Sequence, residues 1–179
     1  MTATFLSTEL VEEISSESSG NGKYINPSKI EGEIRLRFVG EGITGFSGWT
    51  VDKKPLRFEQ APESLPANLA PDLSGKIGLK RFIAGVVYDY EAEDFKILEI
   101  TQRSLMNDLF KYMKDEDYGD PTQYDIKISR TGKGKETEYS LVAAPPKPIS
   151  KTVAAAFEDI TCNLKALFDG DDPFAEPTA

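Results

Sequence analysis

The stretch Glu-Ile-Arg-Leu-Arg-Phe, residues 33–38, decides the fold because its side chains alternate strictly between charged and apolar. A period of two is typical of a β-strand with one face in a core and the other toward solvent. The three apolar residues predict the core face, and Arg35 and Arg37 lie opposite them. The pattern leaves open whether these two arginines line a binding groove or lie on a solvated face.

The chain on either side of this stretch also has mainly β character. Three prolines in 59–75 predict a long loop, and an apolar stripe at helical spacing predicts a helix over 101–114, capped by Thr101 or Ser104. Further strands are predicted over 43–51, 76–90 and 95–100, and two more, 124–130 and 136–143, form a hairpin with a glycine- and lysine-rich tip.

Less regular segments flank this core. Residues 1–22 are a polar leader in which a short helix over Phe5–Ile14 is possible, and a proline-rich exit leads to a helix over 152–168 and an acidic tail. We therefore expect three parts: the leader 1–22, a folded core 23–150, and a C-terminal helix with its tail, 151–179.

Five or six strands with one inserted helix predict a mainly β fold with minor α content. An oligonucleotide/oligosaccharide-binding (OB) barrel fits, because it is a five-stranded Greek key with a helix after its third strand. Counted along this sequence, however, the helix follows the fourth predicted strand.

The composition excludes several kinds of chemistry. The chain has no histidine and one cysteine, Cys162, so Ser-His-Asp and Cys-His catalysis and the usual zinc sites are excluded. We expect no catalytic activity and no cofactor or metal. A single cysteine and the lack of a secretory signal favour a cytoplasmic protein, and no apolar run approaches the ~20 residues of a membrane span.

The net charge of −9 is distributed unevenly. Residues 1–22 contain four acids and no lysine or arginine, and residues 152–179 contain six acids and one lysine. The middle, 23–151, has twenty acidic and twenty basic residues, so a basic groove is possible there if the charges are segregated on the surface.

Aromatic and basic residues occur together in the core, which is the mixture that sequence-tolerant single-stranded DNA binding needs. For Phe38, Phe82, Phe95 and Tyr139 the pattern favours a core position, whereas Trp49 is equally compatible with base stacking and with the core. The basic hairpin tip is either a phosphate contact or an ordinary turn. The candidate DNA-binding residues are Arg35, Arg37, Phe46, Trp49, Lys53, Lys54, Arg57, Lys80, Arg81, Lys127, Arg130, Lys133 and Lys135.

The tail sets several carboxylates before a Pro-Phe pair. Such a peptide is able to dock its ring in an apolar pocket of a partner whose basic rim holds the acids, or to compete with DNA for the protein's own groove. The candidate partner-binding residues are Asp169, Asp171, Asp172, Pro173 and Phe174.

Several stretches resemble the single-stranded DNA-binding proteins of tailed bacteriophages. The resemblance implies an OB barrel in the host cytoplasm, work in DNA replication, recombination or repair, and a tail that recruits the proteins of these processes. The tail also resembles the acidic tip of bacterial single-stranded DNA-binding proteins, except that five residues follow Phe174 here. The stretches that carry the resemblance are Lys80–Phe82, Val86–Tyr90, Lys96–Gln102, Gly119–Pro121, Tyr124–Arg130, Gly134–Tyr139 and Ala144–Pro148.

Two other functions remain open. Asp72, followed by Asp94 and Lys96, superficially matches the acid-then-acid-x-lysine pattern of metal-dependent nucleases. The acids of 115–120 lack the spacing of a calcium loop and indicate a solvated helix end. A phage adaptor protein without DNA affinity is the second alternative.

Overall fold

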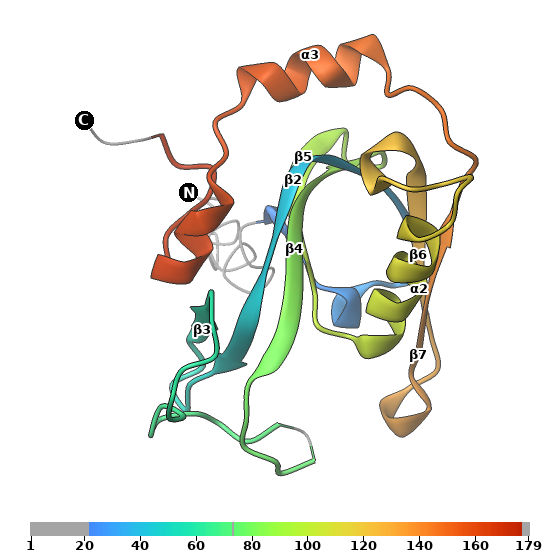
Figure 1. The fold of residues 1–179 in the computed structure, drawn as a ribbon. Coiled ribbons are helices and arrows are strands. Elements are labelled where there is room, and N and C mark those ends of the chain that lie inside the picture. The colour runs from blue at the N-terminus through green and yellow to red at the C-terminus, as the bar shows by residue number, and fades with distance from the viewer. Residues whose placement is uncertain (1–21, 73, 177–179) are drawn as a thin grey trace, which may run out of the picture.

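A computed structural model describes residues 22–72 and 74–176 of the chain (Figure 1). The possible helix over Phe5–Ile14 lies outside these residues. The strands are β1 (Tyr24–Ile25), β2 (Gly32–Trp49), β3 (Pro55–Phe58), β4 (Lys80–Asp89), β5 (Asp94–Ile100), β6 (Asp125–Thr131) and β7 (Glu138–Ala143). The helices are α2 (Arg103–Met113) and α3 (Lys151–Asp159), with 3-10 turns η2 (Pro27–Lys29), η3 (Pro121–Gln123), η4 (Gly134–Glu136) and η5 (Leu164–Asp169).

One curled sheet forms the body of the protein, with the strand order β1-β5-β4-β2-β6-β7 and with β3 added to β2. The order β5-β4-β2-β6-β7 is that of an OB barrel, and α2 follows the third of these five strands. The sheet is a half-barrel, because β1 and β7 are its edges. Helix α2 packs beside β7, where the Asp108 carboxylate accepts a hydrogen bond from the Leu141 amide at 3.0 Å.

Strand β2 joins what the sequence predicts as two strands, 33–38 and 43–51. Its first half pairs with β6, and most of its length pairs with β4 through a register shift between Val39 and Ile43. Gly40 has φ +70° at this bend, and a Cβ on Gly42 would lie 3.0 Å from the Ala84 carbonyl oxygen. Glycines therefore bend the strand without ending it, so two predicted strands are one, and three of the five barrel strands precede the helix instead of four.

The arch of β2 brings distant parts of the chain to one end of the sheet. In Figure 1 β2 rises beside β6, bends over the top and descends beside β4. The loop 59–79 and the tip of the β6–β7 hairpin consequently both project at the lower end of the view.

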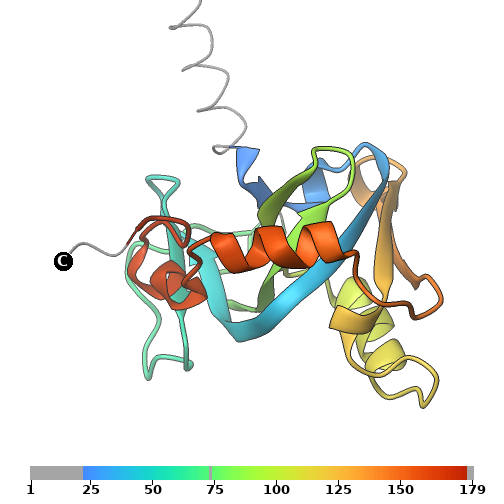
Figure 2. The ribbon, with the colours of Figure 1, turned by 90° about the horizontal axis from the view of Figure 1, so that it is seen from above.

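Apolar residues pack on both faces of the sheet. Leu36, Phe38 and Val87 belong to an inner cluster that α2 completes with Leu105 and Leu109. The outer faces of β4 and β5 form a second cluster, which Figure 2 shows covered by α3 and the segment after it. The core positions expected for Phe38, Phe82 and Phe95 are confirmed, and Tyr139 is partly buried against the inner cluster.

A strand start, a helix cap and the length of the last helix were predicted wrongly. Strand β4 begins at Lys80 rather than at 76. Gln102 precedes α2 without a side-chain cap, so neither Thr101 nor Ser104 caps it. The helix expected over 152–168 is two elements, α3 and η5, because the backbone is extended at Ile160, where α3 ends, and at Asn163, before η5.

Candidate nucleic-acid interface

Arg37 is part of the interior and is removed from the candidate interface. Its side chain is 1% exposed and donates hydrogen bonds to the carbonyls of Thr122, at 2.9 Å, and Lys147, at 2.6 Å. It also pairs with the buried Asp125 carboxylate at 3.1 Å. A fully engaged guanidinium is not available to a phosphate. Arg35 pairs with the same carboxylate at 2.7 Å but keeps a partly exposed side chain.

Asp125 is the centre of a polar cluster that sequence reasoning missed. The Tyr90 hydroxyl donates to its carboxylate at 2.7 Å, beside the two arginines. Burial raises the pKa of Asp125, but the hydrogen bonds from Tyr90, Arg35 and Arg37 outweigh it and leave the pKa below its ordinary value. Burial and the neighbouring carboxylate raise the pKa of Tyr90 to about 12. The cluster is a structural anchor between β2, β6 and the β4–β5 turn.

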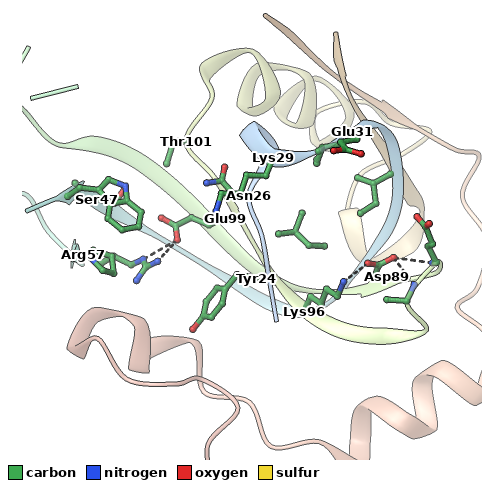
Figure 3. A pocket seen from close by; sticks show the side chains of 18 of the residues that line it. Tyr24, Asn26, Lys29, Glu31, Ser47, Arg57, Asp89, Lys96, Glu99 and Thr101 are labelled. Atoms are coloured by element: carbon green, nitrogen blue, oxygen red, sulfur yellow. Dashed lines mark hydrogen bonds and ion pairs between the residues drawn. The ribbon is translucent and has the colours of Figure 1, made fainter. Parts of the chain in front are cut away.

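A large cavity of about 1090 Å³ opens beside β1, β5 and the end of β2 (Figure 3). Arg57 is bonded there to Glu99 at 2.7 Å, and Lys96 to Asp89 at 2.9 Å. Its lining contains three cations but twice as many carboxylates, so the electrostatic field inside does not favour a phosphodiester. The charged lining residues are Lys29, Arg57, Lys96, Glu31, Glu33, Asp89, Glu91, Glu99 and Asp171.

The outer face of β4 and β5 is occupied by the chain itself. OB folds bind oligonucleotides across the second and third strands of the barrel, which are β4 and β5 here. Phe82 and Ile97 on this face are both fully buried, and Val153, Leu164 and Leu167 of the C-terminal segment cover the cluster to which they belong. A strand of DNA on this face would have to displace an apolar core.

The acidic tail lies against the same cover. Pro173 is buried, its carbonyl accepts a bond from the Asn163 amide at 2.8 Å, and the Phe174 ring packs on the outer cluster. The Lys23 ammonium lies 5.4 Å from the centre of that ring. Asp169, Asp171 and Asp172 remain exposed, whereas the Pro-Phe pair is docked within the chain.

Trp49 lies at the surface, with 56% of its side chain exposed, so the core alternative for this residue is wrong. The loop 59–79 holds its backbone in place, because the Ala70 amide donates to the Trp49 carbonyl at 2.8 Å. The Val51 amide donates to the Asn68 carbonyl at 2.9 Å on the next residue pair. A flat ring is therefore presented to solvent from a hydrogen-bonded base.

Trp49 also lines the large cavity described above. Cations occur in the turn that follows it and on the neighbouring strand β4. Lys53 and Lys54 are exposed in the turn between β2 and β3. Arg81 is exposed on β4, with its guanidinium 4.1 Å from the centre of the half-buried Phe46 ring. Within the described part of the chain, none of these three cations forms an ion pair, so each is available to an anion.

The hairpin tip supplies a second basic loop. Lys133 and Lys135 are exposed on either side of Gly134, and Lys127 is half-buried on β6. Arg130 is half-buried as well and donates to the Ile30 carbonyl at 3.4 Å, which makes it a poorer candidate. In Figure 1 this tip and the loop after β3 lie at the same end of the sheet.

No family model matches the chain, and neither a curated protein nor a solved structure matches it. The strand order alone therefore supports the comparison with OB barrels. Across residues 22–72 and 74–176, no helix has the length and apolar character needed to cross a membrane.

The candidate nuclease residues are each engaged in other contacts. Asp94 pairs with Lys23 at 2.7 Å, and the Asp72 carboxylate accepts from the amides of Ser74 and Lys76. The part of the chain that the structure describes contains no group of three Asp, Glu, Cys or His side chains placed to hold a metal ion.

Proposed function

We propose that this chain binds single-stranded DNA without sequence preference and without catalysis, in DNA replication, recombination or repair. The observation that carries the proposal is the exposed Trp49 ring at the end of β2, followed in the chain by a turn with the exposed Lys53 and Lys54, at the same end of the sheet in Figure 1 as the basic hairpin tip. Rings stack on bases of any sequence, and lysines neutralise phosphates without reading bases.

The proposed interface is smaller than the set that the sequence suggests. It comprises the two basic loops and the strand end between them, and it leaves out the buried Arg37 and the paired Arg57. The remaining candidates are Phe46, Trp49, Lys53, Lys54, Lys80, Arg81, Lys127, Lys133 and Lys135, with Arg35 and Arg130 at its margin.

Partner recruitment by the tail is a further part of the proposal. The exposed aspartates suit a basic partner surface. Because Pro173 and Phe174 are docked on the chain's own sheet, their use by a partner requires the segment to leave that position.

The Trp49→Ala variant tests the proposal. We expect its affinity for oligo(dT) to fall by about 1–3 kcal/mol, which is the contribution of one stacked base. The measurement is a fluorescence-anisotropy titration of labelled oligo(dT) with the full chain. Phe110→Ala is the matched control, because its ring is also exposed but lies on α2 outside the interface. Equal affinities of wild type and Trp49→Ala would remove Trp49 from the site.

The same titration separates the alternatives. An adaptor protein shows no salt-sensitive binding to oligo(dT), and a nuclease shortens the oligonucleotide when magnesium is added.

A further inference from the structure

A second, smaller hollow of about 410 Å³ lies between the start of β4 and the start of α2. Residues from two chain segments form it: the end of the long loop with the first residues of β4, and the β5–α2 junction with the first turn of the helix. Its lining residues are Leu79, Lys80, Arg81, Thr101, Gln102, Arg103 and Met106.

The charge of this hollow is of one sign. Three of its lining residues are cations and none is a carboxylate, in a chain that has 30 acids against 21 bases. The large cavity beside β1 is the opposite case, because two of its three cations are paired to lining acids. Like charges gathered in one hollow repel one another, and an anion between them removes that repulsion.

The three cations of the hollow are exposed to solvent and are not paired with acids within the described residues. Lys80, Arg81 and Arg103 are exposed, and no ion pair engages them within residues 22–72 and 74–176. Lys80 is the last of the groups that lower the pKa of Asp72, after the hydrogen bonds from Ser74 and Lys76. Asp72 is turned to those loop amides and is not part of the lining.

The chemistry of the lining suits a phosphate. The Phe46 ring lies against the Arg81 guanidinium and limits its movement, which reduces the entropy lost when the guanidinium binds. Two guanidinium forks and an ammonium match the three-sided oxygen array of a phosphate better than they match a single carbonyl. Thr101 and Gln102 add polar groups to the wall, above the buried Met106.

We propose that this hollow is a phosphate-binding subsite in which Lys80, Arg81 and Arg103 hold the backbone of a bound nucleic acid strand. The proposal rests on the proposed function for the source of the phosphate, and it adds Arg103, which the sequence did not single out. It places a phosphate of the strand at the first turn of α2, beside the start of β4.

The first experiment asks whether the hollow takes phosphate without DNA. The ¹⁵N-labelled full chain is titrated with inorganic phosphate, against sodium chloride at equal ionic strength. We expect saturable shifts of the Thr101, Gln102 and Arg103 amides, and their loss in Lys80→Gln/Arg103→Gln. Shifts that are absent, or unchanged in this double variant, would overturn the subsite.

The second experiment measures the salt dependence of oligo(dT) binding. Each phosphate contact on a single strand contributes about −0.7 to the slope of log K against log salt. Lys80→Gln/Arg103→Gln should make the slope shallower by about 1.4, whereas Lys111→Gln/Lys114→Gln, which removes the same charge from the other end of α2, should not change it. Equal slopes in the two variants would overturn the subsite while the wild type still binds DNA.

The two experiments distinguish an error in the proposed function from an error in the phosphate subsite. If wild type does not bind oligo(dT) but phosphate still shifts the hollow, the proposed function is wrong and the subsite serves another phosphorylated ligand. If wild type does not bind oligo(dT) and phosphate does not shift the hollow, both proposals are wrong.

Discussion

Asp125 holds the negative charge of the buried cluster, and its loss is expected to cost more stability than loss of an exposed pair. In Asp125→Asn the Arg37 guanidinium stays buried without its counter-charge, so the free energy of unfolding should fall by about 3–5 kcal/mol. Urea unfolding measures it. Asp94→Asn is the control, because the Lys23–Asp94 pair is partly exposed and is expected to contribute about 1 kcal/mol or less.

The pH dependence of the same variant identifies the cause. A carboxyl whose pKa is lowered on folding contributes stability above its ordinary pKa of 3.8 and loses it as pH falls through the lowered value. The stability gap between wild type and Asp125→Asn should be constant from neutral pH to about pH 5 and shrink below about pH 4. A gap that does not change with acidity would contradict the ionic account.

For single residues, the sequence predicted which face of a strand a side chain occupies, but not which distant atoms surround it. Arg35 and Arg37 occupy equivalent positions in the alternating pattern, yet only Arg37 is fully enclosed. The atoms that enclose it belong to Thr122 and Lys147, more than 80 residues away. A local pattern contains no information about contacts of that range.

Among the elements, β2 shows the same limit. Alternation correctly predicted both of its halves, but the bend at Gly40 looked like a break between strands. For the last helix the error was the opposite one: a single helix was predicted where the chain leaves the helical conformation between Ile160 and Asn163. The inserted helix and the final hairpin were predicted within a few residues, because each is a local unit with strong turn or helix signals.

The C-terminal segment is a cover of the sheet as well as an acidic tail, and truncation tests this. A chain ending at Asp172 loses the Pro173 and Phe174 contacts, and we expect its free energy of unfolding to fall by about 1–2 kcal/mol, less than the 3–5 kcal/mol of a fully buried ring. Urea unfolding is again the measurement. A chain ending at Phe174 keeps the docked ring and should match the full chain, so equal stability of both truncated chains would show that the ring contributes nothing.

For the molecule as a whole, the fold decides which cations of the core are paired with acids and which are not. Arg35 and Arg37 are paired with the acid of the Asp125 cluster, and Arg57 and Lys96 with acids in the large cavity, whereas the cations of the proposed subsite form no ion pair within the described residues. The sequence predicted the mainly β, OB-like fold from its alternation. It did not predict that the outer face of β4 and β5 would be covered, because that depends on how the C-terminal segment packs back.

The central claim is that this end of the sheet binds a single strand through phosphates and stacked bases. The most direct measurement is the affinity of the full chain for oligo(dT) at 50 and 200 mM salt. If six phosphates are contacted, the slope of about −0.7 per contact predicts a loss of several hundred-fold between these two concentrations. No binding at the lower concentration, or an affinity that does not change with salt, would contradict the account.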